Sequence, residues 1–491
     1  MLDSTPLQDL HIRVIGTGYV GLVVGACFAE LGYRVVCVDK DERKVESLRQ
    51  GKVLFYESKL ESLVTENLRS GRLSFTAKLS PAASGITVFF IAVGTPSNPD
   101  GSADLSYVVE ASGNIGDMIN GYSIVITKST VPIGTTYRVK KIVQERLKQR
   151  GLGHIPFDVG NNPEFLREGS AVKDFMQPNR IVIGTDSHTC SKWIKALYRP
   201  LTDKGYPLVE MDVISSEMTK YASNTMLASR ISFMNEMSRI CDAVGADIES
   251  VRKGMVYDNR IGSQFLYPGV GYGGSCFPKD VKALIHTASE LQLDSPLLHA
   301  IEKVNQEQKK TLVRMVNRLF GNSLKGVRLA VWGLAFKPDT DDIRESPALD
   351  TIRQLRNQGA ILQVHDPMAM DNAKRELGEE GILYKPEPYE ALHDADALLL
   401  LTEWPNYRAA DLSRINSILR KPIVLDGRNV YDPIMMKEAG IQYFCIGRNA
   451  SSPQFKLENV PKPGFKERGR RQFHPCMMFV RVRRVSQAIQ F

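Results

Sequence analysis

The sequence predicts an α/β protein with two Rossmann-like, doubly wound domains joined by a helical central domain. Short β-branched runs alternate with helical periodicity from residue 11 to about residue 214, and the same alternation restarts at Arg328. Between these regions the strand pattern disappears and apolar residues recur with helical spacing. We therefore expect domains at 11–214, 215–320 and 321–448, followed by a basic, disordered tail at 449–491.

The first strand, 11–15, leads into the glycine-rich segment Gly16–Gly21, and a helical pattern follows as far as Gly32. A second strand, 35–38, ends at Asp39. This β-α-β order predicts a dinucleotide site, in which the glycines admit a pyrophosphate and the carboxylate accepts hydrogen bonds from the ribose. The negative charge of Asp39 favours NAD over NADP. The alternative, a glycine turn in a domain without cofactor, is disfavoured by this context.

Further strands are expected at 87–93, 123–128 and 180–184 in the first domain. In the second α/β domain they are expected at 329–333, 361–365, 395–401 and 422–425. The segment 333–338 follows the first of these strands, where a ligand-binding loop belongs.

The segment Gly271–Asp280 combines glycines with the Cys276 thiol, the Lys279 ammonium and the Asp280 carboxylate. We expect the nearby positive charge to lower the pKa of the thiol and make it a nucleophile. The alternative is an inert, packed thiol. Together with a nicotinamide cofactor, a nucleophilic cysteine predicts oxidation of a carbonyl through a thiol adduct. The seven cysteines are scattered without a CxxC pair, so we expect no disulfide framework and no metal site.

Two further pairs of polar residues are candidates. Glu164 and Glu168 are four apart and would share one face of a helix. They predict either a solvated acidic turn, or a base that handles water together with a contact to cofactor or substrate. Lys220 and Asn224 are also four apart, and they form either a surface pair or a pair aimed at a developing oxyanion.

Composition and charge favour an ordinary globular protein, with 43% hydrophobic and 24% charged residues among 491. No apolar run approaches the ~20 residues of a membrane span, and the first ten residues lack a signal-peptide layout, so we expect a cytoplasmic protein. The net charge of +8 is concentrated in 449–491, which holds nine Lys/Arg and two Asp/Glu. We therefore expect no nucleic-acid partner, and we favour a solvated or non-native extension over a tail that contacts nucleic acid or membrane surfaces.

Several long segments together resemble the UDP-glucose/GDP-mannose dehydrogenase family, both in their amino-acid sequences and in their order along the chain. They lie between residues 11 and 448 and comprise Gly16–Gly21, Lys128–Pro132, Asn162–Gly169, Arg260–Gly262, Phe265–Gly269, Gly271–Asp280, Gly333–Pro347 and Asp426–Asn429. The amino-acid sequence of residues 271–280 resembles that of the family members that oxidise UDP-glucose. Oxidation of GDP-mannose or UDP-N-acetylmannosamine is the alternative within the family, and an idle nucleotide-binding regulatory protein is the alternative of another class.

The resemblance implies a four-electron oxidation of UDP-glucose to UDP-glucuronate with NAD, through a thiohemiacetal and a thioester on Cys276. It implies that Lys220 and Asn224 stabilise the oxyanion at C6. It also implies that Asp280 and Thr130 handle water and that Glu164 is the base for hydrolysis of the thioester.

The resemblance further implies the binding residues and the assembly. The cofactor contacts would be Gly16, Gly18, Val20, Gly21, Asp39, Lys44, Thr95, Thr130, Glu168, Lys279 and Arg344. The sugar-nucleotide contacts would be Glu164, Phe165, Leu166, Arg167, Glu168, Lys220, Asn224, Phe265, Leu266, Tyr267, Pro268, Gly269, Gly273 and Lys337. Arg260 would reach the substrate of a neighbouring subunit, which implies a homodimer or a larger homo-oligomer.

The chain departs from the family pattern at residues 56–60, where Tyr-Glu-Ser-Lys-Leu replaces the usual Tyr-Glu-Pro-Gly-Leu. Lys59 therefore stands in the place of a glycine.

Overall fold

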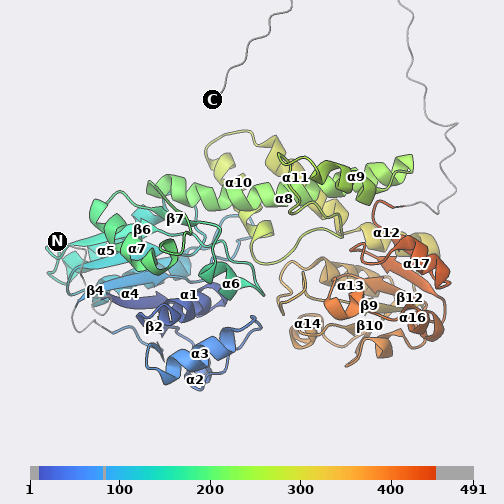
Figure 1. The fold of residues 1–491 in the computed structure, drawn as a ribbon, viewed down its shortest axis with the longest axis horizontal. Helices are drawn as coiled ribbons and strands as arrows, with labels where there is room; N and C mark the ends of the chain where they lie inside the picture. The colour runs from blue at the N-terminus through green and yellow to red at the C-terminus, as the bar shows by residue number, and fades with distance from the viewer. Residues whose placement is uncertain (1–9, 81–84, 449–491) are drawn as a thin grey trace, which may run out of the picture. The chain divides into compact units, whose positions relative to one another are not determined.

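The computed structural model describes residues 10–80 and 85–448, which form two α/β regions and an intervening group of helices (Figure 1). The predicted fold class is confirmed, with an eight-stranded and a six-stranded sheet. The tail at 449–491 lies outside the described residues.

The N-terminal sheet has the order β3-β2-β1-β4-β5-β6-β7-β8. Its strands are β1 (Leu10–Ile15), β2 (Arg34–Val38), β3 (Leu73–Thr76), β4 (Ile86–Ile91), β5 (Ser123–Thr127), β6 (Phe157–Asn161), β7 (Ile181–Gly184) and β8 (Leu208–Met211). The pairing is parallel except at β6 and β7, which meet antiparallel at Asn161 and Gly184. The strands β3, β6 and β8 were not predicted, because they are short or carry Asp, Gly and Asn, which are rare in strands.

Two hydrophobic cores cover the two faces of this sheet. One contains α1 (Tyr19–Glu30), α3 (Leu60–Arg69), α6 (Ala171–Met176) and α7 (His188–Thr202), and the other contains α4 (Ser106–Met118) and α5 (Thr135–Gln149). Helix α2 (Glu42–Arg49) follows β2. Because helices bury both faces, the central strands β4 and β5 are almost continuously apolar. The carboxyl ends of these strands are left open for a site.

The C-terminal sheet is parallel throughout and has the order β11-β10-β9-β12-β13-β14. Its strands are β9 (Arg328–Trp332), β10 (Ile361–His365), β11 (Ile382–Tyr384), β12 (Ala397–Leu400), β13 (Ile423–Asp426) and β14 (Gln442–Cys445). The surrounding helices are α13 (Pro347–Asn357), α14 (Met370–Leu377), α15 (Pro405–Arg408), α16 (Leu412–Ile418), α17 (Pro433–Glu438) and the 3₁₀ turn η2 (Tyr389–Leu392). Trp332 is fully buried in the core of this sheet and stacks on Tyr407 at 4.9 Å.

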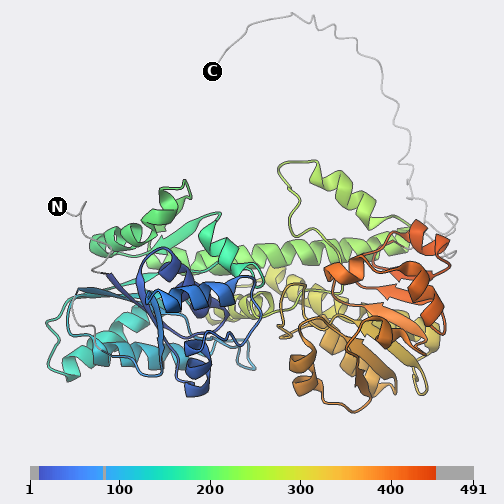
Figure 2. The same cartoon turned by 60° about the horizontal axis from the view of Figure 1, so that its bottom comes forward.

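The helical region consists of α8 (Val213–Val244), α9 (Ile248–Val256), α10 (Phe277–Glu290), α11 (Pro296–Gln308) and α12 (Thr311–Phe320). Helix α8 has 32 residues and passes beside both α/β regions in two views (Figures 1 and 2). The Asp212 side chain accepts a hydrogen bond from Ser215 N at its start, and Gly245 ends it in the left-handed conformation. One helix can therefore carry side chains to a site between the two sheets.

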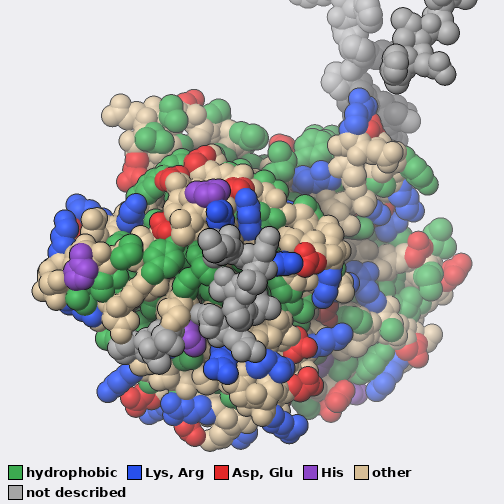
Figure 3. Space-filling view, turned by 60° about the vertical axis from the view of Figure 1, so that its left-hand side comes forward, with side chains coloured by type: hydrophobic (Ala, Val, Ile, Leu, Met, Phe, Trp, Pro, Cys, Tyr) green, Lys and Arg blue, Asp and Glu red, His purple; other side chains and the backbone are tan. Residues whose placement is uncertain are grey.

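The mixed charges on the surface and the burial of most cysteines are typical of a globular protein. Figure 3 shows basic and acidic side chains interspersed over one face of the N-terminal region. Within residues 10–80 and 85–448, no helix combines the length and the apolar composition that crossing a bilayer requires. Six cysteines lie in the described ranges, five are buried, and Cys276 is partly accessible.

Candidate active site

Cys276 lies at the N-terminal end of α10, directly after the glycine-rich loop. A Cβ atom on Gly273 would lie 2.3 Å from Glu345 O, and Gly274 N donates to Arg344 O at 2.8 Å. Only glycine fits this close approach. The loop is thereby fixed against the segment that precedes α13, and the thiol faces the space between the two α/β regions.

Two cavities meet at this thiol. The larger encloses about 950 Å³ and the smaller about 470 Å³. Seven residues line both of them: Lys128, Glu164, Leu166, Glu168, Gly274, Ser275 and Cys276. A group bound in one cavity can therefore exchange atoms or electrons with a group bound in the other, directly at Cys276.

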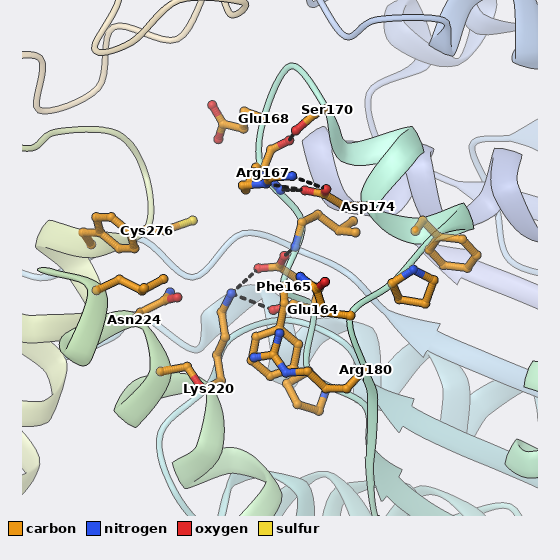
Figure 4. A pocket seen from close by; sticks show the side chains of 18 of the residues that line it. Glu164, Phe165, Arg167, Glu168, Ser170, Asp174, Arg180, Lys220, Asn224 and Cys276 are labelled. Atoms are coloured by element: carbon orange, nitrogen blue, oxygen red, sulfur yellow. Dashed lines mark hydrogen bonds and ion pairs between the residues drawn. The ribbon is translucent and has the colours of Figure 1, made fainter. Parts of the chain in front are cut away.

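Lys220 and Glu164 form a buried ion pair beside the thiol (Figure 4). Lys220 Nζ donates to Glu164 Oε1 at 2.8 Å and to Glu164 O at 2.6 Å. Burial alone would raise the pKa of Glu164, but Lys220 outweighs it and the pKa is lowered. Glu217, one turn earlier on α8, accepts hydrogen bonds from Gly134 N and Thr136 N and so ties α8 to the start of α5.

Asn224 reaches the same site one turn after Lys220, as the predicted helix face requires. Its Nδ2 donates to Asp280 Oδ2 at 2.6 Å, and Lys279 Nζ donates to Asp280 Oδ1 at 2.5 Å. Asp280 is fully buried behind these two side chains. Its carboxylate therefore orients an amide and an ammonium that both belong to cavity walls.

The prediction that nearby positive charge lowers the pKa of the thiol is wrong for this state of the protein. Burial raises the pKa of Cys276 to about 11; Lys220 acts in the opposite direction, and nearby carboxylates raise it further. Burial is the largest cause, and the two nearby ammonium groups are themselves paired, Lys220 with Glu164 and Lys279 with Asp280. The thiol is therefore protonated at neutral pH.

The expected helix carrying Glu164 and Glu168 is also absent, because residues 162–167 form an extended loop after β6. The two carboxylates diverge instead of sharing one face. Glu164 faces Lys220, whereas Glu168 Oε1 accepts a hydrogen bond from Ser275 Oγ at 2.9 Å. The helical spacing misled because partners distant in sequence hold the two carboxylates apart, Lys220 of α8 for Glu164 and Ser275 of the glycine-rich loop for Glu168.

The smaller cavity has the features of a dinucleotide site. It opens at the N-terminus of α1, and seven predicted cofactor contacts line it: Gly18, Val20, Thr95, Thr130, Glu168, Lys279 and Arg344. Gly16 and Gly21 pack so closely that a Cβ on Gly21 would meet Gly16 O at 2.0 Å. Asp39 Oδ2, at the end of β2, accepts hydrogen bonds from Thr17 N at 2.9 Å and Lys44 Nζ at 3.0 Å. These residues fit NAD, since the carboxylate lies where the adenosine ribose belongs.

Comparison with known proteins agrees with this geometry. Three models of the UDP-glucose/GDP-mannose dehydrogenase family match the chain in order: the NAD binding domain at 10–202, the central domain at 214–307 and the UDP binding domain at 330–433. The chain belongs to the UDP-glucose/GDP-mannose dehydrogenase family. It is an NAD-dependent oxidoreductase with a UDP binding domain.

Individual members of the family show the same likeness along most of their length. A UDP-glucose 6-dehydrogenase of Pseudomonas aeruginosa is 44% identical over 89% of this chain and 98% of that protein. The UDP-glucose 6-dehydrogenase TuaD of Bacillus subtilis is 44% identical over 89% of this chain and 93% of that protein. The structure of a UDP-glucose dehydrogenase from Pyrobaculum islandicum aligns with a TM-score of 0.81 and 38% identity, covering 90% and 99% of the two chains.

The larger cavity brings together most of the sugar-nucleotide contacts that the family resemblance implies. Its walls include Glu164, Phe165, Leu166, Arg167, Glu168, Lys220, Asn224, Phe265, Gly273 and Lys337. The predicted contacts Leu266, Tyr267, Pro268 and Gly269 do not line this cavity. Leu266 is buried in the core around Met234, and Tyr267 is exposed with Arg252 over its ring at 4.5 Å. Arg260 is exposed and pairs with Asp258, and it does not line the larger cavity of its own chain.

Sequence reasoning missed several members of the cavity walls. Lys128 is buried and donates to Asn162 Oδ1 at 2.9 Å; burial lowers its pKa to about 7. Arg180 lies over the ring of Phe165 at 3.6 Å. Ser275 lies between the thiol and Glu168. Lys128 lies inside one of the family segments, which was a usable signal, whereas Arg180 stood out only as the first residue of the strand predicted at 180–184.

Proposed function

We propose that the chain oxidises UDP-glucose to UDP-glucuronate with two molecules of NAD, through a covalent adduct on Cys276. The observation that supports this most strongly is the position of the thiol at the junction of the two cavities. A four-electron oxidation needs the same sugar carbon to stay in reach of two successive hydride acceptors. A thiol on the shared wall can hold that carbon while the cofactor is exchanged.

NAD, when bound in the smaller cavity, accepts a hydride at each of the two oxidations. Loss of the first hydride and of the hydroxyl proton converts C6 of the sugar to an aldehyde. Cys276 Sγ then forms a bond to this carbon, and the oxygen becomes the oxyanion of a thiohemiacetal. Lys220 and Asn224 supply the ammonium and amide donors that stabilise this oxygen, and both line the larger cavity.

Loss of the second hydride leaves a thioester on Cys276. Water adds to its carbonyl carbon, the C–S bond breaks, and the sulfur regains a proton while the carboxylate product leaves. Glu164, ionised and 4% exposed, is the base proposed for this water. Asp280 contributes by orienting Asn224 and Lys279. Handling of water by Asp280 and Thr130 stays a prediction.

A panel of sugar nucleotides tests the substrate. We expect NADH absorbance to rise with UDP-glucose and NAD, with two NADH formed for each sugar oxidised, and little rise with GDP-mannose, UDP-N-acetylmannosamine or NADP. Faster turnover of GDP-mannose or UDP-N-acetylmannosamine would assign the other branch of the family. Binding of UDP-glucose without any NADH formation would assign an idle regulatory protein.

The variant Cys276→Ser tests the covalent step. We expect no steady NADH production from UDP-glucose, because an alkoxide of serine neither forms as readily nor leaves as a thiolate does. Cys241→Ser is the matched control, since Cys241 is buried in α8 outside both cavities. Wild-type turnover by the Cys276→Ser variant would refute the mechanism.

We also propose that the chain is a homodimer that joins through α8. Met226, Phe233 and Ile240 recur every seventh residue on this helix, and all three side chains are exposed. An apolar stripe of this kind on a long helix is suited to a second copy. Arg260, exposed in one subunit, would then reach the larger cavity of its partner.

Complementation tests this assembly. Arg260→Ala and Cys276→Ser are each expected to abolish turnover, but a mixed dimer would carry one complete site. Co-expression of the two variants should restore about one quarter of wild-type turnover if each site takes Arg260 from the other subunit. Absence of recovery, or an active monomer in sedimentation, would contradict the proposal. Phe233→Glu should favour monomers, whereas Ile434→Glu on the exposed face of α17 should not.

A further inference from the structure

The side chain of Ser275 connects the reactive thiol to a carboxyl group. Ser275 Oγ lies 3.5 Å from Cys276 Sγ, which is hydrogen-bonding distance for sulfur. The same hydroxyl donates to Glu168 Oε1 at 2.9 Å. All three residues line both cavities, so the row of sulfur, hydroxyl and carboxyl lies along the junction where the sugar and the cofactor meet.

The thiol needs a proton acceptor before it can attack a carbonyl carbon. Lys220 cannot serve, because it is charged and paired with Glu164. Asp280 is occupied by Lys279 and Asn224. With these charges paired, burial keeps the pKa of Cys276 at about 11, and the thiolate is rare at neutral pH. The proton must therefore leave sulfur at about the time that the carbon–sulfur bond forms.

We propose that Ser275 is a catalytic residue that relays the proton of Cys276 to Glu168 as the thiol attacks the sugar aldehyde. The S–H bond breaks and its proton binds Ser275 Oγ, while the original Ser275 proton passes to Glu168 Oε1. The sulfur electron pair forms the bond to carbon. When water later releases the thioester, the same row returns the proton from Glu168 to sulfur, and no other reactant is needed.

The surroundings of Glu168 suit this role. Burial and the nearby Asp342 raise the pKa of Glu168 to about 8, although Arg344, 3.4 Å away, opposes the shift. Lys337 Nζ donates to the backbone carbonyl of Glu168, and Thr340 Oγ1 lies 3.5 Å from Oε2. A carboxylate with a raised pKa binds a proton more strongly than an exposed carboxylate does. If that pKa lies near the working pH, part of the group is still ionised and can accept the proton.

Alkylation of Cys276 tests the relay without any substrate, although the relay rests on the proposed thiol chemistry. Iodoacetamide is applied from about pH 6 to about pH 10, and labelling of the Cys276 peptide is followed by mass spectrometry. In the wild type we expect a rate that rises with a midpoint near pH 8 and then flattens, because ionised Glu168 assists the thiol. Turnover of UDP-glucose is measured separately, so failure of the relay and failure of the proposed activity are distinguishable.

Variants separate the relay from a structural effect. Ser275→Ala and Glu168→Gln should lose the rise near pH 8 and react about 10²-fold more slowly than the wild type once Glu168 is ionised, the size typical of general-base assistance. Ser275→Thr keeps the hydroxyl and should keep the rise. Ser289→Ala, at the exposed end of α10, the helix that follows Ser275 and Cys276, is the matched control. A wild-type profile in Ser275→Ala, or a uniform slowing with the rise retained, would overturn the proposal.

Discussion

Lys220 Nζ lies 2.8 Å from Glu164 Oε1, and each side chain is only 4% exposed. The two residues come from different elements, α8 and the loop after β6. Lys220 lowers the pKa of the neighbouring Cys276 thiol, but burial and the charge of Glu164 act in the opposite direction and the pKa is raised. The site is therefore arranged with its charges balanced, and a developing oxyanion would have to compete with Glu164 for Lys220.

Breaking this pair should destabilise the protein strongly. Lys220→Ala leaves the Glu164 carboxylate buried without its partner, so we expect a loss of about 3–5 kcal/mol in the free energy of unfolding, measured in urea. The matched control is Lys195→Ala, which breaks the exposed pair with Glu210 and should cost less than about 1 kcal/mol. Similar losses in both variants would contradict the buried pairing.

Glu168 should make stability fall as the pH rises. The pKa of Glu168 is about 8 in the folded chain, above the value of about 4.3 for a free Glu, so the folded state binds this proton more tightly. Its stabilising contribution is complete below about pH 4 and is lost as the pH rises through about 8. In urea unfolding between about pH 5 and about pH 9, Glu168→Gln should therefore lose less stability than the wild type. Glu66→Gln, at an exposed site on α3, should follow the wild type.

The glycine loop should not tolerate a side chain at residue 273. In Gly273→Ala the new Cβ would meet Glu345 O at 2.3 Å, so the loop must move away from the segment before α13. Because Cys276 follows three residues later, we expect turnover to fall at least about tenfold, since small misplacements of reacting groups are costly. Gly121→Ala, where the Cβ meets open space, is the control for steady-state NADH assays. Unchanged turnover in Gly273→Ala would show that this packing does not position the thiol.

Replacing Lys59 by glycine should stabilise the protein. It adopts φ 65° immediately before α3, a conformation that side chains disfavour, and it occupies the place of the family's usual glycine. Lys59→Gly should raise the free energy of unfolding by about 0.5–1 kcal/mol, since relief of strain exceeds the added entropy of the unfolded chain. Thermal unfolding checks this. Ser58→Gly, without a positive φ to relieve, should be neutral or destabilising.

Much of the site could be predicted because its members are local in sequence. The fingerprint at Gly16–Gly21 needs only a strand before it and a helix after it, and both are visible as periodicity. Lys220 and Asn224 share a face because helical spacing brings them together. The error at Glu164 and Glu168 has the same origin, since a spacing of four predicts a shared helix face, whereas contacts with Lys220 and Ser275 hold the segment in a loop.

The fold class and the cofactor fingerprint could be predicted from the sequence, and Cys276 could be named as the candidate nucleophile, because each of these depends on short-range order along the chain. The charge state of the site, in contrast, depends on the tertiary structure. Whether Lys220 activates Cys276 or neutralises Glu164 depends on distances between α8, α10 and the loop after β6. Burial strengthens the interaction of Lys220 with whichever of these two groups lies closer. The local sequence does not encode those distances, because the three elements are far apart along the chain.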